Sequence, residues 1–179
     1  MKKKDISSVI WITGLSASGK TTLAELITKD LIERNLEVIM LDGDDLREIL
    51  GATNKHARED RLNLAFVYSR MALSISRQNK IVVVATVALF KEIHKWNREN
   101  INNYFEIFLD VPIRELRARD PKGIYKRYDS GSLDNVAGLD LPIDKPIKPD
   151  LTIRFDKKDS PEDNAVKVLS EFLSKNRLD

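Results

Sequence analysis

Short apolar runs alternate along the chain with longer segments in which apolar residues recur at helical spacing. The runs with apolar or β-branched character predict strands at residues 9–13, 38–41, 81–87 and 105–109. The third run, IVVVATV, is typical of a strand covered on both faces. Leu151, Ile153 and Phe155 alternate with polar residues and predict a fifth strand with one wetter face.

Helices are predicted between these strands, at residues 21–34, about 58–78 and about 91–103, with a further one starting near Pro161. The last helix has strong start signals, with Ser160 as its cap and Asp163 three residues later. Strands that alternate with helices predict an α/β fold with three layers, in which a mostly parallel five-stranded sheet carries helices on both faces.

One segment, residues 114–149, departs from this alternation and is rich in charge, glycine and proline. A loop of that length in a compact domain usually serves as a lid or a binding loop, so we expect a lid here. A disordered insertion is the alternative. The whole chain, residues 1–179, has the length of a single domain.

Composition narrows the classes of partner. Lysine and arginine number 30 against 28 acidic residues, and a balance of +2 does not indicate a protein that binds nucleic-acid phosphates. The chain has no cysteine, which excludes disulfides, thiolate zinc sites and a cysteine nucleophile, and which fits the cytoplasm.

The N-terminus has a superficial likeness to a signal peptide, because Lys2, Lys3 and Lys4 precede the apolar run VIWITGL. That run is short and passes directly into GLSASGKTT, which a phosphate-binding loop explains better. No apolar stretch approaches the roughly 18 residues of a membrane span, so no membrane partner is expected.

The segment GLSASGKT, from Gly14 to Thr21, matches the phosphate-binding loop pattern at every fixed position and lies between a predicted strand and a predicted helix. Its small residues let backbone N–H groups converge on a phosphate at the start of a helix. Lys20 is expected to reach the β- and γ-phosphates of ATP, and the Thr21 hydroxyl to bind Mg²⁺. The predicted ATP-binding residues are Gly14, Ser16, Ala17, Ser18, Gly19, Lys20, Thr21, Thr22 and, in the lid, Arg119. A flexible turn with an exposed lysine is the alternative.

Two classes of nucleotide-binding protein fit poorly. Motor ATPases carry an acidic residue after an apolar strand, and IVVVATVALF has none. A GTPase is also disfavoured, because Asn54 and Lys55 lack the aspartate and the preceding strand of a guanine-reading motif.

The acidic residues follow the second predicted strand instead, in LDGDDLR. Strand ends of a parallel sheet share one edge, so Asp42 and Asp44 are expected beside the phosphate loop. We assign Asp44 as the catalytic group, which takes the proton of an attacking hydroxyl or holds a Mg²⁺-bound water, and Asp42 to the turn or the metal shell. Arg47 is expected to hold an anionic acceptor. The alternative is an acidic turn in which Asp44 or Asp45 caps a helix.

Transfer of a phosphoryl group to a small molecule requires that water be excluded. The lid segment carries Arg114, Arg117, Arg119 and Lys122, which can meet phosphate charge as the lid closes. Any one of them could instead be solvated.

These motifs resemble adenylyl-sulfate kinase over nearly the whole chain. The resemblance rests on GLSASGKTTLA, LDGDDLR and a lid containing DPKGIY and NVAGLDLP. It implies transfer of the γ-phosphate of MgATP to a ribose 3′-hydroxyl. It further implies that Asp44 serves the acceptor hydroxyl, that Arg47 and Lys122 contact the acceptor, that Arg119 lies over ATP, and that the protein is a homodimer.

The acceptor half departs from that family. The resemblance places a phenylalanine near Lys55 and His56 and another at Val136, and the two would sandwich the acceptor's adenine. An acceptor-binding arginine expected shortly after Arg61 is also missing, and the Ser-Pro-Tyr-Arg stretch after the third strand is replaced. Base stacking of that kind is worth about 1–3 kcal/mol per base, so its loss indicates a changed acceptor site, in which Arg61 and Val136 still contact the acceptor.

Three functions therefore remain open. The first is adenylyl-sulfate kinase itself, with ATP and Mg²⁺ as cofactors and adenylyl sulfate as the small-molecule nucleotide acceptor. The second is the same chemistry on another acceptor, such as cytidine diphosphoramidate. The third is a non-catalytic nucleotide-binding protein, which the intact Lys20, Thr21 and Asp44 disfavour. His56 and His94 have no carboxylate or second histidine at ligand spacing, so surface or structural roles are expected for both.

Overall fold

The computed structural model describes residues 6–52 and 57–176. Its centre is a sheet of five strands in the order β2-β3-β1-β4-β5. Every paired strand in this sheet is parallel to its neighbour. The strands are β1 (Ser8–Gly14), β2 (Val38–Asp42), β3 (Ile81–Thr86), β4 (Tyr104–Asp110) and β5 (Leu151–Arg154). The prediction of a five-stranded α/β fold is confirmed.

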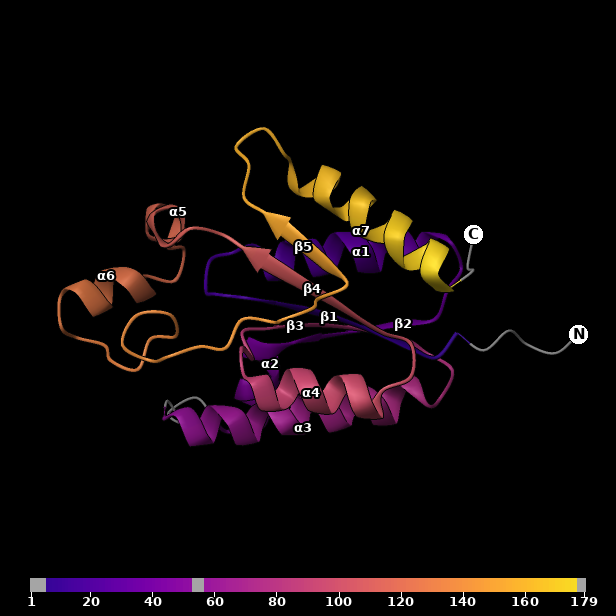
Figure 1. The fold of residues 1–179 in the computed structure, drawn as a ribbon, viewed down its shortest axis with the longest axis horizontal. Helices are drawn as coiled ribbons and strands as arrows, with labels where there is room; N and C mark the ends of the chain where they lie inside the picture. The colour runs from indigo at the N-terminus through magenta and orange to yellow at the C-terminus, as the bar shows by residue number, and fades with distance from the viewer. Residues whose placement is uncertain (1–5, 53–56, 177–179) are drawn as a thin grey trace, which may run out of the picture.

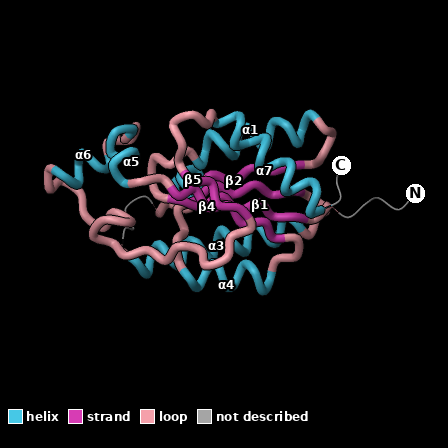
Figure 2. The backbone as a smooth tube through the Cα atoms, turned by 45° about the horizontal axis from the view of Figure 1, so that its top comes forward, coloured by secondary structure: helices cyan, strands magenta, loops and turns pink. Residues whose placement is uncertain are grey.

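Helices cover both faces of the sheet, as Figures 1 and 2 show. The helices of the layers are α1 (Lys20–Glu33) and α7 (Pro161–Asn176) on one face, and α2 (Gly43–Ile49), α3 (Arg58–Ser76) and α4 (Lys91–Asn100) on the other. Alternation along β1 separates two cores: Ile10 and Ile12 pack with α1 and α7, while Val9 and Trp11 pack with α3 and α4. The central strands are apolar throughout because both of their faces are covered.

The start of α7 shows how closely local signals fix an element. The Ser160 hydroxyl accepts a hydrogen bond from the Asp163 N–H at 3.0 Å. The Asp163 carboxylate in return accepts from the Ser160 N–H at 3.0 Å and from its hydroxyl at 2.7 Å. The predicted cap is therefore confirmed, in the reciprocal form of a capping box.

Some boundaries differ from prediction. The helix predicted to about residue 103 ends at Asn100, because β4 begins at Tyr104, and the fifth strand ends at Arg154 before Phe155. Helix α2 follows β2 directly, and its cap is Asp42 rather than Asp44 or Asp45. The Asp42 carboxylate accepts the Asp44 N–H at 2.8 Å, which leaves the carboxylate of Asp44 available.

The segment predicted as a lid is described over its whole length, so the alternative of a disordered insertion is wrong. It contains most of α5 (Ile113–Arg119) and all of α6 (Ile124–Asp129). These helices project beyond the end of the sheet (Figure 1). Leu116, Tyr125 and Val136 form a small core of its own, against which Leu15 and Ala17 of the phosphate-binding loop pack. The lid is thus attached to the loop it is expected to cover.

His94 corrects one expectation. Its Nδ1 lies 2.7 Å from a carboxylate oxygen of Glu106, which is buried in β4, and its Nε2 lies 3.1 Å from the Asp144 carbonyl oxygen. The histidine therefore has a carboxylate partner that sequence spacing did not reveal, although its role is structural as expected. His56 lies outside the described residues. Among residues 6–52 and 57–176, no helix is long and apolar enough to cross a bilayer.

Candidate active site

The functional side chains gather at the carboxyl-terminal edge of the parallel sheet. The phosphate-binding loop follows β1, Asp42 ends β2, Thr86 ends β3, and Phe155 follows β5. They surround a cavity of about 1050 Å³ that the lid also lines. Strand ends of a doubly wound sheet form such crevices, because the chain leaves adjacent strands in opposite directions there.

The loop between β1 and α1 has the conformation that phosphate binding requires. Ala17 and Gly19 have positive φ angles of 63° and 94°, which turn the chain into the start of α1. Lys20 lies at that start and donates a hydrogen bond from Nζ to the Leu15 carbonyl oxygen at 2.8 Å. Burial lowers the pKa of Lys20 to about 8, although the charges of Asp44 and Asp42 oppose that shift. A bound phosphate would favour the charged form of Lys20 and raise its pKa again.

Oxygen donors suited to a hard cation lie next to this lysine. The Thr21 hydroxyl donates to one carboxylate oxygen of Asp42 at 2.7 Å, while the other oxygen of Asp42 caps α2. Asp44, two residues after Asp42, is exposed and lines the cavity. Hydroxyl and carboxylate oxygens are ligands that Mg²⁺ prefers, with phosphate and water completing its shell. These residues therefore fit Mg²⁺, with Thr21 and Asp44 as the predicted contacts.

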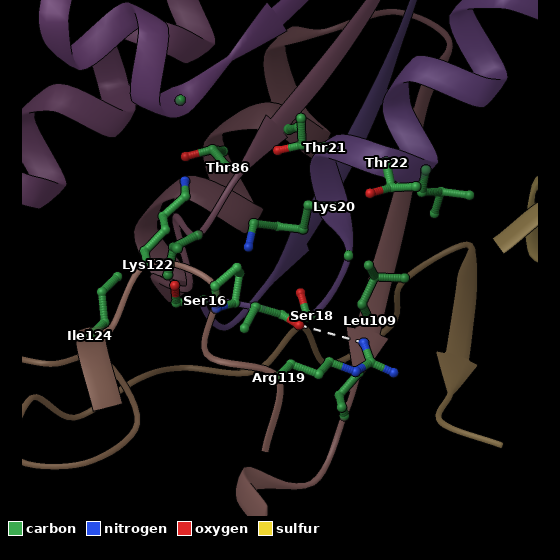
Figure 3. A pocket seen from close by; sticks show the side chains of 18 of the residues that line it. Ser16, Ser18, Lys20, Thr21, Thr22, Thr86, Leu109, Arg119, Lys122 and Ile124 are labelled. Carbon is green, nitrogen blue, oxygen red and sulfur yellow. Dashed lines mark hydrogen bonds between the residues drawn. The ribbon is translucent and has the colours of Figure 1, made fainter. Parts of the chain in front are cut away.

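Lys122 of the lid reaches Asp44, the aspartate predicted to be catalytic. Its Nζ forms an ion pair with the Asp44 carboxylate, and both side chains line the cavity. Lys122 is labelled in Figure 3. Burial alone would raise the Asp44 pKa, but the hydrogen bond and charge of Lys122, with the charges of Arg47 and Lys20, lower it. Asp44 is therefore ionised at neutral pH, as a proton acceptor must be.

The lid makes two further contacts with the phosphate-binding loop. The Tyr125 hydroxyl donates to the Ser16 carbonyl oxygen at 3.0 Å, and Arg119 donates to the Ala17 carbonyl oxygen at 3.5 Å (dashed line in Figure 3). The Arg119 guanidinium also lies 5.0 Å from the ring centre of Phe155. Arg119 and Phe155 thus place a cationic and an aromatic side chain together in the lining of the cavity.

The residues predicted to bind the acceptor lie together in the lining of the same cavity. Arg47 and Arg61 both line the cavity, and Arg61 donates to the Asn135 carbonyl oxygen of the lid at 2.9 Å. Burial and the charge of Arg47 lower the pKa of Arg61. Val136 lines the same wall and is 5 % exposed. The structure therefore brings Asp42, Asp44, Arg47, Arg61, Lys122 and Val136 into one cavity with the phosphate-binding loop. Arg114 and Arg117 do not line it: Arg114 pairs with Glu115 and Arg117 with Asp129.

Sequence reasoning missed several residues that line the cavity. They include Thr86, Arg127, Asp134, Phe155 and Asn164. Thr86 and Phe155 had one available signal, because each stands at or just past the end of a strand of a parallel sheet. Arg127, Asp134 and Asn164 carry no such signal, since only the folded lid and the start of α7 bring them to the site.

Comparison with known proteins identifies the family. A sequence model described as adenylylsulphate kinase matches residues 6–154. The cytidine diphosphoramidate kinase of Campylobacter jejuni is 36 % identical over 164 residues, which cover 92 % of this chain and 95 % of that protein. The adenylyl-sulfate kinase of Pseudomonas aeruginosa is 35 % identical over 177 residues, covering 98 % and 89 %.

A solved structure agrees with these relatives. The APS kinase of Mycobacterium tuberculosis, in complex with AMPPNP and APS, superposes with a TM-score of 0.85 and 30 % identity, covering 92 % of this chain and 96 % of that one. The chain therefore belongs to the adenylylsulphate kinase family and is an ATP-dependent phosphotransferase.

Proposed function

We propose that this enzyme transfers the γ-phosphate of MgATP to a ribose hydroxyl of a pyrimidine nucleotide acceptor of the cytidine diphosphoramidate type. Adenylyl sulfate, the acceptor implied by the family as a whole, is the second candidate. The donor half supports both equally, because the phosphate-binding loop, Lys20 and Thr21 are intact. The choice between the two depends on the acceptor wall, the part of the cavity lining that contains Arg47, Arg61 and Val136.

One observation carries the choice of acceptor. Among the described residues that line the main cavity, Phe155 is the one aromatic side chain, and it lies with Arg119 on the donor side. Val136, on the acceptor wall, is short and packed into the lid core. Among the described residues, a purine held between two aromatic rings therefore has no matching surface on this wall, whereas a smaller base loses less without those rings.

The proposed mechanism relies on position and charge. Thr21 and Asp44 would hold Mg²⁺, which would neutralise phosphate charge when bound. Lys20 holds the transferred group, Thr21 and Asp44 orient the oxygens around it, and Asp44 accepts the proton of the attacking hydroxyl. Arg47, Arg61 and Lys122 bind the anionic part of the acceptor, and the lid excludes water. No covalent intermediate is involved.

An ADP-release assay with a panel of acceptors tests this proposal. The panel contains cytidine diphosphoramidate, CDP, adenylyl sulfate and a reaction with no acceptor. We expect the highest kcat/KM with cytidine diphosphoramidate, weak turnover of adenylyl sulfate and little release without acceptor. A higher kcat/KM with adenylyl sulfate would assign the enzyme to sulfate assimilation instead, and release that is independent of every acceptor would contradict a kinase.

We also propose that the enzyme acts in the cytoplasm as a homodimer. Its lack of cysteine is compatible with a reducing compartment, and dimers are common in the family that it resembles. Light scattering after size exclusion tests the second statement, with a mass of twice 20.5 kDa expected. A single-chain mass would contradict it.

A further inference from the structure

A small side pocket opens from the main cavity behind the acceptor arginines. Its volume is about 30 Å³, enough for roughly two water molecules or a small tetrahedral group. The residues that line both this pocket and the main cavity define the throat between them. They are Arg47, Arg61, Thr86, Val87 and Ala137.

Thr86 stands at this throat as the last residue of β3. It is 6 % exposed, and the turn after β2 packs against it. A Cβ atom on Gly43 would lie only 3.0 Å from the Thr86 hydroxyl oxygen, so glycine lets the Asp42–Asp44 turn approach this closely. Within the described parts of the chain, the Thr86 hydroxyl has no hydrogen-bond partner. Its side chain is shown in the cavity in Figure 3.

The other polar groups of the throat and side pocket are limited in what they can bind. Arg47 and Arg61 carry only hydrogen-bond donors and suit the oxygens of an anion. The Tyr68 hydroxyl, in the side pocket, donates to the Gly43 carbonyl oxygen at 3.2 Å and accepts a hydrogen bond from Arg47. Thr86 is therefore the one side chain among the described throat residues that can accept a hydrogen bond from a ligand.

We propose that Thr86 is an acceptor-binding residue whose hydroxyl accepts a hydrogen bond from the terminal group of the acceptor. The inference rests on the proposed function and specifies its acceptor further. The ligand class is a nucleoside diphosphate derivative whose terminal group offers phosphoryl oxygens to the arginines and an N–H to Thr86. A phosphoramidate has both features, whereas an ionised sulfate has no hydrogen to donate. Apolar walls at Ala88, Leu89 and Ile143 limit that group to a small size.

The test compares Thr86→Val, which removes the hydroxyl at nearly constant shape, with Thr86→Ser, which keeps it. Because an N–H left unpaired in the complex weakens binding, we expect Thr86→Val to raise the KM for cytidine diphosphoramidate roughly tenfold. The KM for adenylyl sulfate should change less. Thr86→Ser should restore the value to within about threefold, and the Kd for MgADP, measured by calorimetry, should stay the same in both variants.

Thr152→Val is the matched control, because Thr152 lies on β5 and lines neither cavity. If Thr86→Val does not fold, Thr86→Ala replaces it in the same comparison. The inference is overturned if the hydroxyl-free variant keeps its acceptor KM, or if it weakens MgADP instead of the acceptor. If Thr86→Val turns over cytidine diphosphoramidate with the KM of the wild type, this inference alone is overturned. If the wild-type enzyme turns over no acceptor, the proposed function is overturned as well.

Discussion

Charge at the reacting centre is set by a few residues from distant parts of the chain. The charge of Lys20, at the phosphate-binding loop, interacts with Asp42 and Asp44, and Lys122, from the lid, forms an ion pair with Asp44. In the absence of ligand, these charges partly neutralise each other. In the proposed mechanism, a bound triphosphate would pair with Lys20 and the anionic group of the acceptor with Lys122, which frees the Asp44 carboxylate for the attacking hydroxyl.

Lys20 makes this exchange measurable. Because its pKa is lowered to about 8, a fraction of the free enzyme carries a neutral lysine near that pH. Bound phosphates favour the charged form and raise the pKa, so binding should take up a proton. We expect calorimetry of MgATP analogue binding near pH 8 to show proton uptake, seen as a dependence of the heat on the buffer's ionisation enthalpy.

The same titration at about pH 6.5 should show almost no uptake, since Lys20 is then charged in both states. In Lys20→Met the uptake near pH 8 should disappear. Equal uptake in that variant would show that another group titrates and would remove this account of Lys20.

The predictability of single residues follows from how local their signal is. Gly14 to Thr21 form a contiguous motif, so the sequence was enough to predict the loop and the place of Lys20. The Lys122–Asp44 pair joins residues 78 positions apart. The sequence placed Asp44 at the sheet edge and Lys122 in the lid separately, but it did not predict that the two side chains pair. The position of Thr86 at a strand end was a signal for the site, but its proposed contact with the acceptor could not be predicted, because the throat forms only on folding.

At the scale of elements, the lid is held by specific contacts with what it covers. Tyr125 and Arg119 bind the phosphate-binding loop, and Arg61 of α3 binds the lid backbone. Asp140 stabilises the lid turn by accepting the N–H groups of Asn135 and Val136, each at 2.7 Å. Displacing one of these contacts should therefore affect nucleotide binding as well as local stability.

Two lid glycines separate these effects. Gly138 and Gly131 have φ angles of 83° and 71°, so alanine at either should cost about 1–2 kcal/mol of stability. Only at Gly138 would the new Cβ contact the loop, since it would lie 2.9 Å from both terminal methyl carbons of Leu15. We expect Gly138→Ala to weaken MgADP binding and Gly131→Ala to leave it unchanged, as calorimetry can determine.

The two variants share their strain, so Gly131→Ala serves as the control for loss of stability. Equal MgADP affinity in both would contradict coupling between the lid and the loop. The short lid helices α5 and α6 were not predicted, and the equally short α2 was foreseen only in the alternative that Asp44 or Asp45 caps a helix. Segments of 6 or 7 residues have little helical stability of their own, and here packing and caps supply it.

At the scale of the whole molecule, a polar network connects the segment between the lid and β5 with β4, α4 and α7. Asp150, just before β5, accepts hydrogen bonds from the Glu106 N–H at 2.8 Å and from Arg98 at 2.7 Å, and it pairs with Lys175 of α7. Glu106 in turn binds His94, which contacts the chain at Asp144. The apolar strand pattern was sufficient to predict the sheet, but this network was not foreseen because its members are far apart in sequence.

Asp150 gives the network a pH signature. Burial alone would raise its pKa, but the hydrogen bonds from Glu106, Lys175 and Arg98 lower it below the usual 3.8. The unfolded chain therefore binds the proton more readily, and the stability that Asp150 contributes is complete above that usual pKa. It is lost as the pH falls through the lower folded pKa.

We expect Asp150→Asn to lower the free energy of unfolding by about 1–3 kcal/mol at pH 7, as measured by urea denaturation. The difference from wild type should shrink as the pH falls below about 4. Asp30→Asn, at an exposed pair with Arg34, is the control and should change stability by less than about 1 kcal/mol. A penalty at Asp150 that does not vary with pH would contradict an ionic role.

The central claim is that this fold passes a phosphoryl group from ATP to a nucleotide hydroxyl with the help of Asp44. Mass spectrometry of the nucleotides, after incubation of enzyme, MgATP and cytidine diphosphoramidate, tests that claim most directly. The account predicts an acceptor that has gained one phosphoryl group on its ribose, with formation slowed about 10²- to 10⁴-fold in Asp44→Asn although that variant still binds ATP. An unmodified acceptor beside ADP and free phosphate, or an Asp44→Asn variant as fast as wild type, would contradict it.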